Sequence, residues 1–337
     1  MASIEVSTGR VNAMNLIRKI GLWLSATAAG IMLLGAVPLP AQTCYSRSDI
    51  EPATLSSLQN LAASYLQSAR AGNAAALQSA AEFNLGDVLA ANKDLWGVQD
   101  NLRAIYLLDN AQGQAKGGEF YCGIYNSPNR IGFIFGGLPA GRYAVAIQDV
   151  SGGKAPAMIS WILHQNGAQW RIAGLYVKPT QIGGHDGAWY LAQARAYRAK
   201  GQNHNAFFYY LTVNDLIRPF PAMSTPQLDK LYDEMQAVRP ADLPSGKTPI
   251  GLTAGGRVFK MTELFPLPVG NDLDVVVKYE EPDISDTGKT FQDNMAVIKA
   301  LVAKYPELRE AFAGVVARAV APNGQDYGSL LAMKDVK

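Results

Sequence analysis

Cysteine, histidine and charged residues are all scarce in this chain. It has two cysteines and three histidines in 337 residues, and only 17% of its residues are Asp, Glu, Lys or Arg. The histidines, His164, His185 and His204, are scattered, and with the cysteines they do not form the short spacings typical of metal ligands. The sequence therefore predicts no metal site and no cofactor, and it offers no convergent set of catalytic residues.

Basic clusters are missing as well. The chain has 30 basic and 28 acidic residues, and its first 41 residues contain three of the basic and one of the acidic ones, so the remainder is balanced. Affinity for nucleic acid depends mainly on neutralising phosphates, and anionic membranes attract polybasic segments. We therefore expect neither nucleic acid nor a membrane to bind the chain after residue 41.

Residues 1–41 have the pattern of a secretory signal peptide. Arg18 and Lys19 precede an uncharged apolar run, Ile20–Val37, and Ala41 supplies a small residue at the expected cleavage point. This pattern predicts export to the periplasm or outside the cell, with Met14 as an alternative start. The other interpretation is an uncleaved anchor helix, but the run is slightly short of the roughly 20 apolar residues that span a bilayer.

The two cysteines predict a disulfide. In an oxidising compartment, an even number of cysteines favours pairing, which would join Cys44 to Cys122 and close a long loop. The alternative is that Cys122, which lies in an apolar run, is a buried free thiol.

The chain between residues 42 and 180 changes character part-way. Residues 49–109 are rich in Ala and Leu at helical spacing, and we expect the last helical piece at Val98–Leu108. From residue 119, apolar and polar residues alternate between turn signals, and Asn166-Gly167 is a strong hairpin signal. The predicted strands are Glu119–Tyr125, Arg130–Phe135, Arg142–Val150, Ala157–Gln165 and Ala168–Val177.

This order of helices followed by a meander resembles the NTF2-like, or cystatin-like, cone fold over residues 50–178. The closing hairpin Ile-Ser-Trp-Ile-Leu (159–163) and Gln-Trp-Arg-Ile-Ala-Gly (169–174) is also similar. A second resemblance, of residues 133–143, is to carboxypeptidase-regulatory-like β-sandwiches. The NTF2-like resemblance implies a cavity in the sheet, and we expect a ligand pocket lined by Tyr143, Asp149, Trp161 and His164.

Residues 181–239 form a second, helical segment. Residues 188–219 resemble a single tetratricopeptide (TPR) unit with a turn at Gly201, and Leu228–Val238 would add a capping helix. Because one unit cannot form a groove, the alternative is a helical hairpin that packs on its neighbours. The residues that carry the resemblance are Tyr190, Ala194, Tyr197, Gly201, Ala206, Tyr210, Val213 and Pro219.

A proline-rich linker over residues 240–256 precedes a small α+β unit over residues 257–337. We expect strands at Arg257–Leu264, Leu273–Tyr279, Gly314–Val320 and Ser329–Met333, with a helix at Thr290–Lys304. The Gly-Lys-Thr at 246–248 lacks the strand and helix that a phosphate-binding loop needs. The Asp-Thr-Gly at 286–288 is better explained as a cap for the helix that follows.

The remaining polar cluster is His185 with Asp186, at the joint before the TPR-like segment. The pair could perform acid–base work, but Asp186 is also placed to cap the helix that begins at Ala188. Taken together, the sequence predicts an exported, multi-domain α+β protein that acts in protein binding or assembly in the cell envelope rather than as an enzyme. The alternative is a small-ligand-binding protein or an enzyme that uses the first domain's sheet. The order of segments also resembles secreted bacterial proteins.

Overall fold

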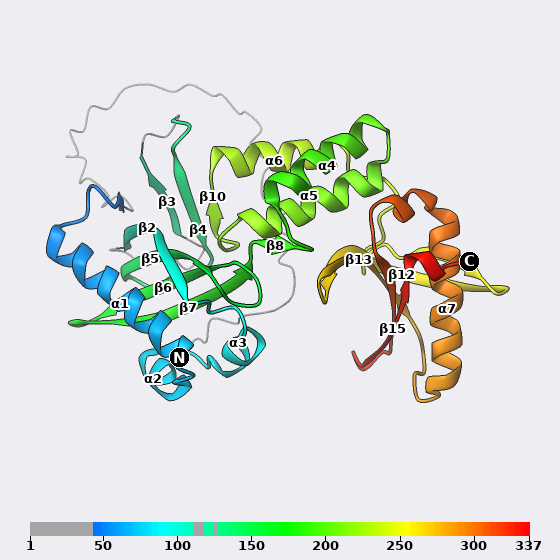
Figure 1. Cartoon of the computed structure of the whole chain (residues 1–337), viewed down its shortest axis with the longest axis horizontal. Helices are drawn as coiled ribbons and strands as arrows, with labels where there is room; N and C mark the ends of the chain where they lie inside the picture. The colour runs from blue at the N-terminus through cyan, green and yellow to red at the C-terminus, as the bar shows by residue number, and fades with distance from the viewer. Residues whose placement is uncertain (1–42, 111–117, 124–126) are drawn as a thin grey trace, which may run out of the picture.

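The computed structural model describes residues 43–110, 118–123 and 127–337, and the predicted signal peptide lies outside this range. The protein has a mixed α+β fold, as the sequence predicts. Figure 1 shows a large sheet with helices at one end of the molecule, a helical segment in the middle, and a second sheet at the other end. In the described part of the chain, no helix is long and apolar enough to cross a membrane.

The first helices form where the sequence supplies caps and an apolar stripe. The Glu51 carboxylate accepts hydrogen bonds from the backbone of Ala53 and Thr54, and Pro52 occupies the first turn, where no backbone donor is needed. The stripe of helix α1 faces the large sheet. The bounds are α1 Pro52–Arg70, α2 Ala74–Ala80 and α3 Gly86–Ala91.

The large sheet is antiparallel and has the order β1-β2-β5-β6-β7. Its central strands are buried on both faces, because Ala146 and Trp161 pack beneath α1 while Val145 and Ile162 pack on the opposite side. Gly167 has a φ of 60°, as the predicted Asn-Gly turn between β6 and β7 requires. The strands are β1 Thr43–Ser46, β2 Gln99–Asn110, β5 Gly141–Ser151, β6 Ala157–Asn166 and β7 Gln169–Pro179.

A small sheet covers the face of the large sheet that α1 leaves free (Figure 1). Its order is β10-β4-β3, with bounds β3 Gly118–Cys122, β4 Ile131–Phe135 and β10 Met223–Ser224. The Cys44–Cys122 disulfide joins β1 to β3, with 4.9 Å between the two Cα atoms. The predicted disulfide is therefore present, and it ties the two sheets together.

The helical segment consists of α4 Gly187–Ala199, α5 Asn203–Ile217 and α6 Pro226–Gln236. It follows a two-strand hairpin, β8 Gln181–Ile182 and β9 His185–Asp186. Gly201 turns the chain between α4 and α5 with a φ of 74°. Helix α5 is apolar on most of its circumference, which is typical of a helix packed on several sides.

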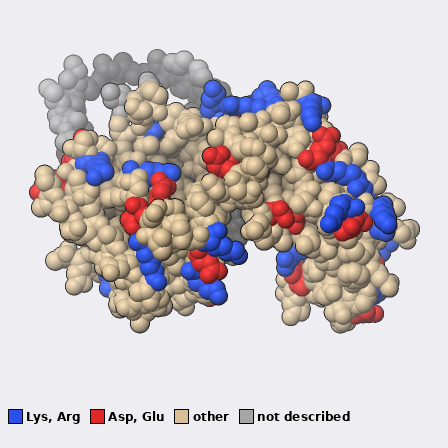
Figure 2. Space-filling view, viewed as in Figure 1, with Lys and Arg blue, Asp and Glu red and all other residues tan. Residues whose placement is uncertain are grey.

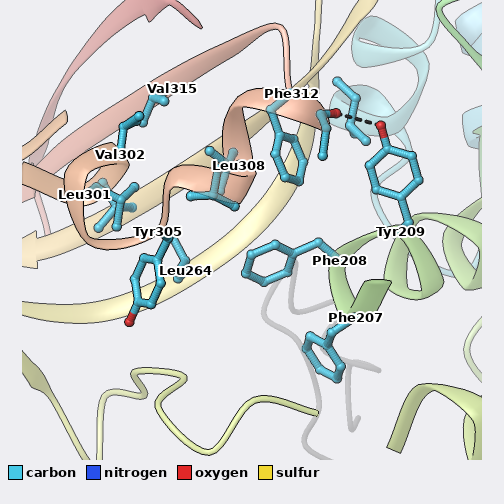
Figure 3. Packing of buried hydrophobic residues seen from close by; sticks show 14 of the residues in the cluster. Phe207, Phe208, Tyr209, Leu264, Leu301, Val302, Tyr305, Leu308, Phe312 and Val315 are labelled. Atoms are coloured by element: carbon cyan, nitrogen blue, oxygen red, sulfur yellow. Dashed lines mark hydrogen bonds between the residues drawn. The ribbon is translucent and has the colours of Figure 1, made fainter. Parts of the chain in front are cut away.

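The helical segment and the C-terminal sheet share one hydrophobic core. The Tyr209 hydroxyl donates a 2.6 Å hydrogen bond to the Ala311 carbonyl, and the Phe208 and Phe312 rings lie 6.0 Å apart. Figure 3 shows these aromatic side chains of α5 against the turn that follows α7. His204 lies between two carboxylates, 3.1 Å from Glu307 and 3.0 Å from Asp242. The helices are therefore fixed to the C-terminal unit by apolar and charged contacts.

The C-terminal sheet has the order β11-β12-β13-β14-β15. Its central pair, β13 and β14, is parallel, and α7 followed by a 3₁₀ turn at Pro306–Glu310 makes the crossover between them. The Asp286 carboxylate caps α7 by accepting a hydrogen bond from the Lys289 backbone, as predicted. The bounds are β11 Ile250–Ala254, β12 Arg257–Val269, β13 Asp272–Glu280, α7 Thr287–Lys304, β14 Gly314–Val320 and β15 Asp326–Ala332.

Two sequence predictions need correction. The predicted helix at Val98–Leu108 is wrong, because this stretch forms most of strand β2. The strand is buried on both faces near its end, so its apolar residues do not alternate and instead imitate a helical spacing. The predicted linker over residues 240–256 also contains strand β11, which pairs with β12.

Candidate functional site

The C-terminal sheet has one covered face and one open face. Residues directly opposite each other on paired strands point to the same side, so the strand registers define the two faces. Val275, Val277 and Val315 point toward α7 and belong to the large shared core. Val276 and Val316 point to the other side and are not part of that core. Figure 1 shows α7 along one side of this sheet.

An apolar row crosses four strands on the open face. Phe265 of β12 is opposite Val276 of β13, Val276 is opposite Val316 of β14, and Val316 is opposite Leu330 of β15. We call these four residues the apolar row. Neighbouring strands lie about 4.8 Å apart, so the row extends roughly 14 Å across the sheet.

The apolar row is buried at its centre and exposed at one end. Val276 has no exposed area, whereas Leu330 is 53% exposed. Two more exposed apolar side chains, Leu267 at 39% and Val258 at 61%, lie on the same face of β12. The Leu330 side chain also extends over Gly314, where an added Cβ would lie 3.1 Å from Leu330 Cδ1. The open face therefore presents an apolar surface around Phe265, Leu267 and Leu330, while Val258 lies further along β12 beyond charged residues.

Charged groups border the apolar row on one side. Lys278 Nζ lies 3.3 Å from a Glu263 carboxylate oxygen and 5.5 Å above the Phe265 ring. Arg318 makes two hydrogen bonds to Asp326 on the neighbouring strand. An apolar centre with paired charges at its rim is the usual composition of a protein–protein interface.

A buried carboxylate lies on the other side of the row. Asp274 is 3% exposed and is opposite Leu267. Burial, with the nearby charge of Asp272, raises the pKa of Asp274 above the usual range, although the backbone N–H of Gly314 partly opposes this rise. The Asp274 carboxylate is therefore harder to ionise than an exposed one.

The four residues predicted to line a pocket in the large sheet are divided between its faces. Trp161 is fully buried under α1, where its indole nitrogen donates a 2.7 Å hydrogen bond to Gln148. Tyr143 lies on the opposite face, and Asp149 lies six residues further along the same strand, ion-paired to Arg103. Only Tyr143 and His164 are brought together, with ring centres 4.7 Å apart.

His164 is enclosed by its neighbours. Its Nδ1 atom lies 2.9 Å from a Glu82 carboxylate oxygen, and its Nε2 atom lies against Gly141, where an added Cβ would be only 2.9 Å away. Burial and the Glu82 charge raise the pKa of Tyr143 to about 12. These contacts hold the imidazole in one orientation between the loop after α2 and the sheet, and they leave little space for a substrate beside Nε2.

The predicted joint residues lie in the hairpin before α4. Asp186 caps α4 by accepting a 2.9 Å hydrogen bond from the backbone of Trp189, and His185 stacks on the Trp189 ring at 3.8 Å. Both joint residues are exposed. Gly183 and Gly184 form the hairpin turn with positive φ values. The pair therefore organises the start of the helical segment.

No family model, curated protein or solved structure matches the chain. The resemblances of residues 50–178 to NTF2-like domains and of residues 188–219 to a TPR unit therefore stay predictions. In the part of the chain that the structure describes, no group of three His, Cys, Asp or Glu side chains is arranged to hold a metal ion.

The apolar row was not found by sequence analysis. The strands that carry it were expected, except for the extension of β12 beyond Leu264 that contains Phe265. Their order in the sheet was not expected, since the parallel pairing of β13 with β14 depends on how α7 packs. A usable signal was the run Asp-Val-Val-Val at 274–277, because a strand with consecutive apolar residues presents apolar groups on both faces.

Proposed function

We propose that this protein is exported and binds another protein through the open face of its C-terminal sheet. The observation that carries the proposal is the apolar row, which ends in the half-exposed side chain of Leu330. Contiguous apolar surface on a folded domain is a common sign of an interaction site. Export is supported by the disulfide, because such bonds persist in oxidising compartments.

The position of the row favours a partner that presents an extended segment. Strand β15 is an edge strand of the sheet, so a strand from another chain could pair with its outer side and extend the face.

Figure 2 shows the molecule hollowed between its two lobes, with acidic and basic residues interspersed on the visible surface. A mixed apolar and charged surface of this kind selects a protein partner rather than a polyanion.

The structure supports a partner contact by the TPR-like hairpin less well than the sequence predicts. Most of α5 is buried, and its aromatic residues pack into the core that the helices share with the C-terminal sheet. The exposed residues of these helices lie mainly on the outer side of α4 and on parts of α6, with Asn203 and Asp215 exposed on α5. We therefore assign the partner contact to the sheet, with the helices as its support.

Site-specific photo-crosslinking in intact host cells tests this proposal. A photoreactive residue at position 330 should give a discrete adduct in the cell-envelope fraction, whose mass identifies the partner. The matched control is position 291 on α7, where Phe291 is 48% exposed but lies away from the open face. A second arm introduces Val316→Glu and should remove the adduct at 330 without altering the fold by circular dichroism.

Three crosslinking outcomes would contradict the binding part of the proposal. The first is equal crosslinking at positions 330 and 291, and the second is no adduct at 330 although the protein is folded. The third is an adduct at 330 that persists in the Val316→Glu variant. Recovery of the protein from the cytoplasm with its first 41 residues attached would contradict export.

A further inference from the structure

Two basic residues, Lys178 and Arg218, are in contact at the edge of the large sheet, through the Lys178 side chain and the Arg218 backbone. Lys178 is near the end of β7, and Arg218 is the residue at the carboxyl end of α5. The Lys178 ammonium donates a 3.3 Å hydrogen bond to the backbone carbonyl of Arg218, so the two residues are in contact. Within the described residues, neither side chain forms an ion pair.

Arg218 stands apart from the other arginines with unsatisfied buried atoms. Its Nε atom is buried and has no hydrogen-bond partner, as is true of one nitrogen each in Arg70 and Arg130. However, Arg70 is ion-paired to Asp100 and Arg130 to Asp229, whereas the Arg218 guanidinium forms no hydrogen bond to any described residue. Arg218 is partly buried, and leaving its buried Nε atom without a hydrogen bond is costly, so a partner there would be favourable.

The neighbouring acidic groups do not supply that partner. Asp215 is exposed and lies beyond ion-pair distance of both cations, and Asp229 is already bound to Arg130 and to Ser224. Asp149, two strands away from Lys178, is paired with Arg103. Burial lowers the pKa of Lys178 and that of Arg218, and the nearby carboxylates offset this only in part.

A tyrosine hydroxyl lies on the same side of β7 as Lys178, two residues before it. Residues 218–220 cross the ends of β6 and β7, where the Ser160 hydroxyl approaches the Pro219 carbonyl at 3.5 Å and Phe220 stacks on Tyr176 at 5.5 Å. Tyr176 lies on the same side of β7 as Lys178, and no hydrogen bond uses its hydroxyl among the described residues. Burial raises the pKa of Tyr176, which keeps the hydroxyl protonated and able to donate.

We propose that Lys178 and Arg218, assisted by the Tyr176 hydroxyl, form a binding site for a small oxyanion such as a phosphate or carboxylate group. Guanidinium and ammonium groups are the donors that proteins use for such groups, because charge-assisted hydrogen bonds are the strong ones. In addition to burial, the Arg218 charge is near enough to Lys178 to lower the Lys178 pKa. An oxyanion placed there would satisfy the Arg218 donors and relieve the repulsion between the two cations. This site is independent of the open face of the C-terminal sheet.

The experiment measures thermal stability and heat of binding with two probes, inorganic phosphate and glycerol phosphate, against sodium chloride at equal ionic strength. Both probes should bind saturably, and the melting temperature should rise by about 3 °C or more at concentrations far above Kd. Tighter binding of glycerol phosphate would show that the natural ligand carries its anionic group on a larger molecule. Equal binding would assign the site to the free anion.

The decisive variant is Arg218→Met, which keeps the apolar part of the side chain. It should weaken binding at least 10-fold while the ligand-free protein melts at the same or a higher temperature, because a buried donor without a partner and a half-buried charge have been removed. The matched control is Lys299→Met, which changes an exposed cation on α7 and should leave binding unchanged. Tyr176→Phe should weaken binding less than Arg218→Met does.

Three results would overturn the proposal. The first is that neither probe binds the intact protein, and the second is that Arg218→Met binds as tightly as the intact protein. The third is that Arg218→Met lowers the melting temperature of the ligand-free protein and the intact protein shows no anion-dependent shift. In that last case, Arg218 would serve only to stabilise the carboxyl end of α5.

Discussion

The large sheet and the C-terminal sheet both have five strands, but they bury different numbers of faces. The large sheet is covered by α1 on one side and by the small sheet on the other. The C-terminal sheet is covered by α7 and the helical segment on one side only. The covered faces of the large sheet leave its edge as the accessible part, whereas the C-terminal sheet also exposes one face. The two proposed sites follow this difference.

The largest expected effect of a substitution is in the doubly covered sheet. Trp161→Ala should cost about 3–5 kcal/mol of unfolding free energy, because it leaves a cavity under α1 and deprives Gln148 of its hydrogen-bond donor. Leu330→Ala on the open face should cost about 0.5 kcal/mol or less. Chemical denaturation of both variants measures the difference.

If both substitutions lowered the unfolding free energy by similar amounts, the face that carries Leu330 would be covered, and the proposed difference between the two sheets would be wrong. The m-value should also be checked, since a change in it would indicate that the two lobes unfold separately in one of the variants.

The next effect concerns the disulfide, which only the N-terminal half possesses. The bond closes a loop with a sequence separation of 78, so replacing both cysteines by Ala should cost about 4 kcal/mol in the chain-entropy model. The loss should appear in the unfolding of the large sheet and leave the C-terminal sheet unchanged. Hydrogen exchange of β2 compared with β13 separates the two regions, and equal loss of protection in both strands would mean that the lobes unfold as one unit.

The smallest expected effect is a pH dependence of the stability of the helical segment. Hydrogen bonds from Arg195, and to a lesser degree from Tyr210, lower the pKa of Glu234 on α6. A carboxylate with a lowered pKa contributes stability above its unfolded pKa of about 4.3, and this contribution is lost as the pH falls through the folded value. Glu234→Gln should therefore cost about 1 kcal/mol or less at neutral pH, and its cost should vanish in acid.

Unfolding of the intact protein and the Glu234→Gln variant between pH 3 and pH 7 checks this expectation. The matched control is Glu263→Gln, whose ion pair with Lys278 lies on the open face, where it is more exposed to solvent. A difference between intact protein and Glu234→Gln that grows in acid would have the wrong sign and would exclude the proposed cause.

The comparison also explains what the sequence could reveal. The strands from residue 118 to residue 179 were predicted within a few residues, because their turns carry strong local signals such as Asn166-Gly167. Strand β2 was missed because burial on both faces removes the alternation that identifies a strand. Strand β11 was missed although Gly255 and Gly256, both with positive φ, mark its hairpin with β12.

Neither proposed site could be found from sequence alone. The apolar row needs the order of four strands, which is fixed by long-range packing. Lys178 and Arg218 are separated by 40 residues and belong to segments that the sequence assigns to different domains. Whether a basic side chain has an ion-pair partner depends on all its neighbours in space, so the sequence does not reveal that these two have none among the described residues.

The disulfide has a further consequence for proteolysis. The chain from Cys44 to Cys122 is a covalent ring that contains the first three helices and strand β2. A single cut by a protease anywhere inside this ring divides the backbone but releases no fragment, so the nicked protein keeps its full mass until a reductant is added. In an environment rich in proteases, the first domain can therefore survive a break in its backbone that would separate an unbridged chain into two pieces.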